Sequence, residues 1–417
     1  MALEKLGRES SFVRKTSFGQ GLGSLSESVP QARVGPDSSC VDIWLSRFYR
    51  ANRTAMNIIK ATHRFEEWLG RHTPLVKPDL RLKHERMAEA VFPFLRATFY
   101  RWMQIWPEVC PDLAKAPRVL AVGDLHVENF GTWRDIEGRL VWGVNDFDEA
   151  AVLPYTIDLV RLATSAVLGI EDGHLALKPK DACASILEGY KESLAHGGRP
   201  YVLEEENTWL RQIATGVLRD PVHFWQKMDG LPRVRGEVPA SAREALEHLM
   251  PERGLTYRTV RRVAGLGSLG HIRVVSIALC HGARVAREAK GLTPSSVYWA
   301  TEDDRPSEIL YQAIISRAVR CPDPFVQLRG HWIVRRLSPH CSRIELSVLP
   351  SDRDERRLLS AMGWETANIH LGTVDAQKYI RGHLARLKPS WLYTAAKKME
   401  EAVTVDWRAW KKSGDFS

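Results

Sequence analysis

The sequence predicts an α+β protein in which helical segments flank a small antiparallel sheet, and two observations carry this prediction. Apolar residues recur at helical spacing over 41–69 and 84–106, again from Tyr155, and over most of 355–411. Between 257 and 290, three runs rich in β-branched residues are separated by a glycine-rich turn and by His281-Gly282, as in consecutive antiparallel strands. Helices, then strands, then helices again is an order typical of the α+β class.

Helix-breaking residues and shorter patterns place the remaining elements. Pro78 and the stretch from Pro107 to Pro117 are expected to break the N-terminal helices. The apolar runs RVLAVGD and RLVWGVND predict two short buried strands. Residues 1–39 are rich in Ser, Gly, Arg and Gln without apolar periodicity, so we expect them to be disordered. Further helices are expected over 180–196, 203–216, 240–249 and 306–319, and further strands over HWIVRRL and SRIELSVL.

Composition limits the class of protein. The 417-residue chain is long enough for two or three domains, and its 44% hydrophobic and 26% charged residues are ordinary for a soluble globular protein. No run approaches eighteen consecutive apolar residues, so we expect no membrane span. The six cysteines have no paired spacing and the N-terminus has no apolar leader, which favours a cytoplasmic location. The net charge of +9 attracts anions, but the basic residues are spread along the chain, so we do not expect nucleic acid as a partner.

Polar residues with the chemistry of a phosphoryl-transfer site follow the two short strands. Asp124 and Asn129 lie in VGDLHVENFG after the first apolar run, and Asp146 and Asp148 lie in NDFDEA at the end of the second. Phosphoryl transfer needs one base and hard oxygen ligands for Mg²⁺, and these side chains would supply both. The alternative is a polar turn in which the carboxylates only cap backbone amides. We favour the chemical interpretation because four acceptor groups crowd the ends of two buried strands.

A glycine-rich loop follows much later in the chain. Gly265, Gly267 and Gly270 form GxGxxG around Ser268, and the next residues, HIRVVSIALC, indicate a strand rather than the helix of a dinucleotide-binding fold. Strand, glycine loop, strand is the layout of a hairpin that folds its backbone over nucleotide phosphates. Glycines suit that role because a Cβ would hold the backbone away from the phosphate oxygens. A loose glycine β-turn is the alternative.

The third β-rich run, RVAREAK, offers two cations to those phosphates, Arg287 and Lys290. Residues three apart on a regular strand point to opposite faces, so at most one of the two should face the ligand. Arg96 in FPFLRATF and Arg335-Arg336 in WIVRRL could contact phosphate or an anionic substrate, but each could equally be a structural ion-pair arginine.

Several motifs in one order, GDLHVENFG, NDFDEA, DLVRLATS, GLGSLG and REAK…PSS, resemble an uncharacterised bacterial family, domain of unknown function 2252, from about Lys83 to the C-terminus. The first two motifs also look like the catalytic segments of aminoglycoside and choline phosphotransferases, members of the protein-kinase-like group. That second resemblance implies that Asp124 is the catalytic base and that Asn129 and Asp146 are metal ligands. It also implies that Asp158 steadies the catalytic loop and that His126 is structural. Asp148 has no counterpart there.

The order of the motifs departs from that of ordinary kinases, in which the glycine loop precedes the catalytic loop. We interpret the chain as a circularly permuted, kinase-like fold of two lobes, since permutation costs little where termini lie close together. The alternative is a glycine loop unrelated to the acidic cluster. The expected parts are a disordered segment over 1–39, a large helical lobe with the catalytic and metal-binding loops over 40–254, a small β-rich nucleotide lobe over 255–350, and C-terminal helices over 351–417 that pack on the helical lobe.

These interpretations together predict an ATP- and Mg²⁺-dependent phosphotransferase. Three alternatives stay open: nucleotidyl (AMP) transfer on the same fold, a metal-dependent phosphohydrolase, and a nucleotide-binding pseudokinase. Nothing in the sequence identifies the acceptor, which could be a small molecule or a protein. The expected site consists of Asp124, Asn129 and Asp146 for the chemistry, Asp148 as a further metal contact, and Gly265, Gly267, Ser268, Gly270, Arg287 and Lys290 for the nucleotide.

Overall fold

Helices and small antiparallel sheets alternate along the chain, which confirms the predicted α+β class. The computed structural model describes residues 56–204, 206–215, 220–302, 308–341, 343 and 354–414, all of which belong to a unit that spans Arg33–Ser417. The segment expected to be disordered, 1–39, and the first part of the predicted 41–69 helix lie outside the described residues. The division of the unit into two lobes stays a prediction.

Four helices form the first described segment: α2 (Ile58–His72), α3 (Lys77–Glu89), α4 (Val91–Ala97) and α5 (Phe99–Val109). Pro78 lies in the first turn of α3, so it does not break a helix there. Pro107 lies inside α5, but this helix ends two residues later, at Val109, within the stretch expected to break it. A proline is tolerated in the first turn because its missing N–H would have no partner there. The predicted helical stretch over 84–106 is instead divided at Ala90 and Thr98. Pro93 explains the first division, because it cannot donate to the Glu89 carbonyl that a continuous helix would offer.

Two small sheets carry the acidic motifs. β1 (Arg118–Ala121) pairs with β4 (Ala151–Pro154), and β3 (Leu140–Val144) lies between β2 (Phe130–Arg134) and the short β5 (Tyr201–Val202), all antiparallel. The runs RVLAVGD and RLVWGVND form β1 and β3, as predicted. The loop 122–129 joins β1 to β2, and the loop 145–150 joins β3 to β4. Both acidic motifs are therefore held between short paired strands.

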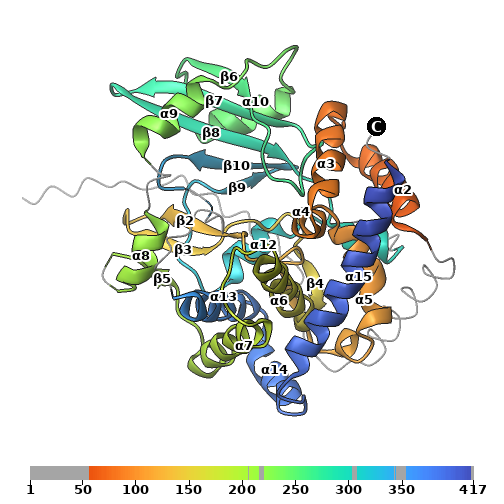
Figure 1. Ribbon diagram of the computed structural model, residues 1–417. Helices are drawn as coiled ribbons and strands as arrows, with labels where there is room; N and C mark the ends of the chain where they lie inside the picture. The colour runs from red at the N-terminus through yellow and green to blue at the C-terminus, as the bar shows by residue number, and fades with distance from the viewer. Residues whose placement is uncertain are drawn as a thin grey trace, which may run out of the picture. The chain divides into compact units, whose positions relative to one another are not determined.

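The helix α6 (Tyr155–Glu171) is the centre of the helical core, with every residue from Tyr155 to Gly169 buried. A helix with no exposed side must be covered by other elements all round. α7 (Pro179–His196), α13 (Glu355–His370) and α15 (Trp391–Ser413) contact it, and β1 also lies against it (Figure 1). The predicted C-terminal helices are α13, α14 (Ala376–Leu384) and α15.

The third sheet has five strands, and all neighbouring pairs are antiparallel. Its order is β6 (Tyr257–Arg261), β7 (Arg273–Cys280), β8 (Ala283–Gly291), β10 (Trp332–Leu337) and β9 (Gln327–Arg329). α10 (Ala240–His248) covers one face, on which Val274, Ala289 and Val334 lie. α9 (Pro221–Asp229) packs on part of the other face (Figure 1), and Lys290 lies on that second face. The predicted strand HWIVRRL is β10, whereas SRIELSVL lies mostly outside the described residues.

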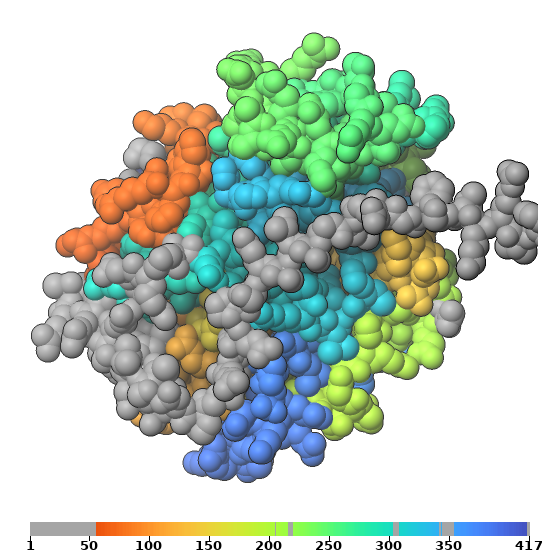
Figure 2. Space-filling view, turned by 180° about the vertical axis from the view of Figure 1, so that it is seen from behind, coloured from red at the N-terminus to blue at the C-terminus, as the bar shows by residue number. Residues whose placement is uncertain are grey.

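Shorter elements complete the described part of the chain. They are η1 (Leu113–Lys115), α8 (Thr208–Ala214), α11 (Ser296–Ala300) and α12 (Tyr311–Arg317). Seen from behind in Figure 2, the green residues of α9, α10 and the neighbouring strands gather at the top, and blue residues from the last part of the chain are visible at the bottom. Within the described residues, no helix combines the length and hydrophobicity that crossing a membrane requires.

Candidate active site

One pocket receives side chains from both distant parts of the sequence. It occupies about 850 Å³ when its open mouth is included. The glycine loop and the two acidic loops, some of whose residues are separated by more than a hundred positions, therefore line the same space. The expected residues in its wall are Asp124, Asn129, Asp146, Asp148, Gly265, Gly267 and Ser268.

Asp124 is held in the pocket by a buried arginine. Its Oδ1 accepts hydrogen bonds from Nε of Arg161, at 2.8 Å, and from Nη2 of the same residue. Arg161 is fully buried and its guanidinium lies 5.0 Å and 4.9 Å from the ring centres of Phe99 and Trp102. Burial raises the pKa of Asp124 to about 6, although Arg161 opposes that rise. A carboxylate with a pKa near neutrality is suited to accept a proton in catalysis.

Hydrogen bonds to α6 hold the loop that carries Asp124. The fully buried Asp158 accepts hydrogen bonds from the backbone N–H groups of Val122, at 2.7 Å, and Gly123, at 2.8 Å. Nε2 of His370 lies 3.0 Å from the same carboxylate. Asp158 and Arg161 are three residues apart, so they lie on the same side of α6. One helix therefore positions both the loop backbone and the Asp124 side chain.

The side chains of Asn129 and His126 form hydrogen bonds with the backbone of the same loop. Oδ1 of Asn129 accepts the backbone N–H of His126 at 2.8 Å, and Nδ1 of His126 accepts the backbone N–H of Glu128 at 3.2 Å. Burial lowers the pKa of His126 well below its usual value, so the imidazole is neutral. A carbonyl oxygen has two lone pairs, so Oδ1 of Asn129 keeps one for a further ligand.

Lys290 lies against the two carboxylates of the second acidic loop. Its Nζ forms an ion pair with Asp148 and lies 3.8 Å from Oδ1 of Asp146. Burial raises the pKa of Asp146, but Lys290 and Arg335 outweigh it and lower that pKa to about 2. For Asp148, burial and the charge of Asp146 raise the pKa to about 6 despite Lys290. Asp146 is therefore the carboxylate of the pair that stays ionised below about pH 6, whereas at neutral pH both are ionised.

Oxygen atoms suited to a hard cation are present but do not form a closed cage. Oδ1 of Asp148 is buried and has no hydrogen-bond partner within the described part of the chain. With Asp146 and Asn129, it offers the carboxylate and amide oxygens that Mg²⁺ prefers. Mg²⁺ is usually held by one or two carboxylates together with substrate phosphates, so these residues fit a metal that arrives with a nucleotide.

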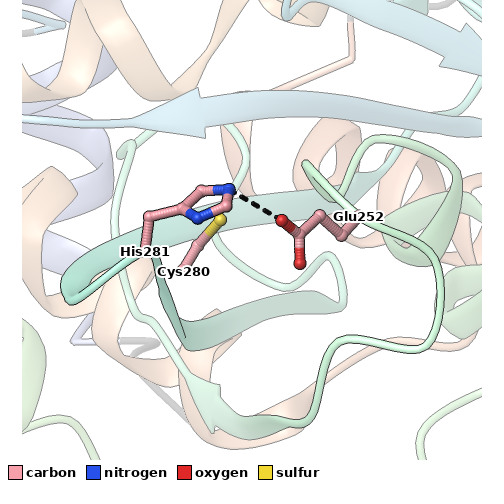
Figure 3. Close-up of side chains that lie close together, drawn as sticks. All are labelled: Glu252, Cys280 and His281. Carbon is pink, nitrogen blue, oxygen red and sulfur yellow. Dashed lines mark ion pairs between the residues drawn. The ribbon is translucent and has the colours of Figure 1, made fainter.

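Among the described residues, three side chains outside the pocket lie close enough together to bind one metal ion. Glu252, Cys280 and His281 have ligand atoms within 4.8 Å of one another, at the turn between β7 and β8 (Figure 3). The Nε2 atom of His281 forms an ion pair with Glu252 at 2.8 Å. This turn lies at the opposite end of the β7–β8 hairpin from the glycine loop, on the order of 25 Å away. It is no part of the pocket.

The glycine loop lies directly on the loop that carries Asp124. A Cβ built on Gly267 would lie 3.1 Å from the Arg96 carbonyl oxygen and 3.5 Å from Oδ2 of Asp124. Gly270 has φ +102°, and a Cβ there would lie 2.5 Å from a methyl group of Leu80. The pocket space that the centre of a water molecule can reach is about 70 Å³. That volume holds on the order of five waters.

The basic candidates occupy different places. Arg287 lies on the α10 side of the sheet, where Nε donates to the Leu249 carbonyl at 2.8 Å and the guanidinium stacks on Phe325. Strand alternation puts Lys290 on the other side, so only Lys290 reaches the acidic loops and Arg287 does not contact the site. Arg335 pairs with Glu288 at 2.9 Å, which is the structural role that we left open for it. Arg96 lines the pocket and pairs with Glu128 at 2.5 Å.

Three residues of the site were not among the predicted ones. Arg161 had a signal in the sequence, because DLVR places it three residues after Asp158 on one helix face. Glu149 accepts hydrogen bonds from Oγ of Ser295 at 2.8 Å and the backbone N–H of Ser296 at 2.7 Å, and burial raises its pKa to about 7. Lys83 lines the pocket from α3, and no local pattern marked this lysine as buried.

Comparison with known proteins gives a family resemblance over part of the chain. Residues 75–222 match a family described as "Uncharacterized protein conserved in bacteria (DUF2252)". No curated protein and no solved structure matches the chain. The matched residues include Lys83, Asp124, Asn129, Asp146 and Asp158, but they end before the glycine loop and cover less than half of the sequence. Over this stretch, the chain is similar to an uncharacterised bacterial domain family.

Proposed function

We propose that this protein is an ATP- and Mg²⁺-dependent phosphotransferase that acts at the pocket between the glycine loop and the two acidic loops. One observation carries the proposal: Gly267 lies so close to Asp124 that a methyl group at position 267 would contact its carboxylate. A flexible glycine backbone above a buried carboxylate and hard oxygen ligands is the set of parts that phosphoryl transfer uses.

The spacing and order of the parts support a kinase-like arrangement. Asp124 and Asn129 are five residues apart, as are the base and the metal-binding asparagine of the kinase catalytic loop. The glycine loop joins the first two strands of the antiparallel sheet and Lys290 lies on the third, which is also where kinases carry their lysine. A circularly permuted, two-lobed fold with a nucleotide lobe over 255–350 is part of this proposal, as is a cytoplasmic location.

Each polar residue has a role that follows from its surroundings. A bound Mg²⁺–ATP would supply the transferable phosphoryl group and neutralise its charge. Asp146, which stays ionised, would hold the metal with Asn129, and Asp148 would add its unpartnered Oδ1. Asp124 would accept the proton of the attacking hydroxyl, and Arg161 would keep its carboxylate in place. Because the accessible space is only about 70 Å³, the glycine loop must lift before a nucleotide enters.

The alternatives fit the site less well or share its parts. A two-metal phosphohydrolase needs several further ligands around two ions about 3.5–4 Å apart, and within the described residues no such cluster lies in the pocket. A pseudokinase has no chemical need for a base with a raised pKa beside two metal ligands. Transfer of AMP uses the same residues, so it remains the second candidate and is separated by its product.

The test is a thermal-shift screen of ATP, AMP and other nucleotides, each with and without Mg²⁺. Binding to the folded state alone raises its stability by roughly 2.7 kcal/mol at a hundredfold excess over the dissociation constant. We expect a shift with ATP that needs Mg²⁺ and is lost in Asp146→Asn. The matched control is Asp112→Asn, which removes an exposed carboxylate outside the pocket. An equal ATP shift in Asp146→Asn would contradict the proposal, and mass spectrometry of the products would separate phosphoryl from AMP transfer.

A further inference from the structure

Lys83 is a buried cation that forms no ion pair with any carboxylate in the described part of the chain. Its side chain projects from α3 into the pocket wall, and the residue is only 3% exposed. Its Nζ donates one long hydrogen bond, to the Gly267 carbonyl at 3.3 Å, and lies 6.0 Å from the centre of the Tyr100 ring. No carboxylate among the described residues forms an ion pair with it, so most of its hydrogen-bonding capacity is unused.

The acidic groups nearest to Lys83 are engaged elsewhere. Glu66 binds Nε2 of His84 at 2.7 Å, Glu149 accepts the hydrogen bonds of Ser295 and Ser296, and Asp124 is paired with Arg161. Burial accordingly lowers the pKa of Lys83, and these distant carboxylates offset the fall only in part. Burying a charge without a partner costs several kcal/mol, so a protein that keeps one gains from a ligand that completes it.

The glycine loop beside Lys83 also has unused donors. Among the described residues, no acceptor receives the backbone N–H of Gly267 or of Ser268. Backbone N–H groups in a glycine loop are suited to phosphate oxygens, because they approach closely and carry partial positive charge. Lys83 contacts the carbonyl of this same loop, so an ammonium group and free amides border one side of the pocket.

Lys290 cannot take the same part while it is bound to its carboxylates. It is 1% exposed, and Asp148 and Asp146 already supply it with two negative charges. A phosphate group that approached Lys290 would meet those carboxylates first, unless a metal ion lay between them. Lys83 faces no such competition. The two lysines therefore differ in what they can bind.

We infer that Lys83, with the backbone N–H groups of Gly267 and Ser268, forms a subsite for a phosphate group of the ligand. In the proposed function, on which this inference rests, that group belongs to the phosphate chain of the nucleotide. Lys290 then holds the metal-binding carboxylates in position, and Lys83 is the lysine that contacts phosphate. The ligand is an anion with phosphate oxygens, and its negative charge would neutralise the buried ammonium group of Lys83.

Calorimetric titration of sodium pyrophosphate and of Mg²⁺–ATP into Lys83 variants tests this subsite. Lys83→Met removes the charge, and Lys83→Gln removes it but keeps a donor for the Gly267 carbonyl. We expect both variants to bind each probe at least tenfold more weakly, while the unliganded protein melts no lower than wild type because an unpaired buried charge is gone. Lys83→Arg should keep most of the affinity. Lys77→Met, at the exposed start of the same helix, is the matched control and should bind normally.

The outcomes separate this inference from the proposed function. Binding of Mg²⁺–ATP with unchanged affinity in both Lys83→Met and Lys83→Gln would overturn the subsite and leave the phosphotransferase proposal in place. Pyrophosphate binding that depends on Lys83, without any binding of ATP, would support the subsite and count against the phosphotransferase. A wild-type protein that binds neither probe would overturn the subsite. Lower melting of the unliganded Lys83→Gln protein, with unchanged affinity for both probes, would assign Lys83 a structural role instead.

Discussion

Replacing each of two glycines in one loop by alanine should have different effects: one substitution should reduce the stability of the fold, and the other should weaken ligand binding. Gly270 has a backbone conformation that L-residues rarely adopt, with φ +102°, and its new Cβ would lie 2.5 Å from a methyl group of the buried Leu80. Gly267 has no positive φ, and its new Cβ would point toward the Arg96 carbonyl and Asp124. Gly270→Ala therefore perturbs the fold, whereas Gly267→Ala perturbs the space above the catalytic loop.

The structure gives the size of each effect. For Gly270→Ala, a strained backbone costs about 1–3 kcal/mol and the overpacking against Leu80 costs about 1–3 kcal/mol, so we expect a loss of about 2–6 kcal/mol. For Gly267→Ala, the restricted unfolded chain stabilises by about 0.4–1 kcal/mol and the tight 3.1 Å contact offsets it, so stability changes by less than about 1 kcal/mol. The methyl group near Asp124 should weaken Mg²⁺–ATP binding at least about tenfold, which is about 1.4 kcal/mol.

Unfolding in urea, followed by the fluorescence of the fourteen tryptophans, measures the first quantity, and calorimetric titration of Mg²⁺–ATP measures the second. The expected pattern is an unstable Gly270→Ala and a stable Gly267→Ala that binds poorly. The reasoning is refuted if Gly270→Ala is as stable as wild type. It is also refuted if Gly267→Ala folds normally and binds Mg²⁺–ATP as tightly as wild type.

Two further predictions concern buried carboxylates outside the pocket. Asp158→Asn leaves one acceptor oxygen for the two backbone N–H groups of Val122 and Gly123, and its NH₂ group faces the N–H that has lost its acceptor. The free energy of unfolding, measured in urea, should therefore fall by about 2–4 kcal/mol. A fall of less than about 1 kcal/mol would contradict the role of Asp158 in holding the loop. Burial raises the pKa of Glu365 from 4.5 to about 7, so between these values the native state holds a proton that the unfolded state releases. Stability contributed by that proton is complete below pH 4.5 and is lost as pH rises to about 7. Wild type should lose up to about 3 kcal/mol of stability between pH 4.5 and pH 8 that Glu365→Gln does not lose, because an amide does not titrate. Parallel stability–pH curves for the two proteins would contradict this expectation.

The sequence was informative wherever local patterns decide the structure. The β-branched runs and the turn at His281-Gly282, where both residues have positive φ, predicted β7 and β8 correctly. Asp124 and Asp146 were both predicted as site residues because each follows a short buried strand; the two strands, β1 and β3, belong to different sheets. Alternation along β8 also implied that only one of Arg287 and Lys290 would face the acidic loops.

Features that depend on distant neighbours were beyond the sequence. Lys83 is buried because α3, the glycine loop and Tyr100 enclose it, and nothing in LRLKHERM indicates this. The ion pair between Lys290 and Asp148 joins residues that are 142 positions apart in the sequence. The helix start at Pro78 was missed because a proline in the first turn starts a helix as readily as a proline elsewhere ends one, and tertiary packing decides between the two.

The central claim is that one cation and one phosphate chain join the acidic loops to the glycine loop. The most direct test is a crystal structure with Mn²⁺ and a non-hydrolysable ATP analogue, in which an anomalous difference map locates the metal. We expect a manganese peak in contact with Asn129 and Asp146, and phosphates beneath Gly267 and Ser268. A peak confined to Glu252, Cys280 and His281, with a pocket that contains no analogue, would contradict it.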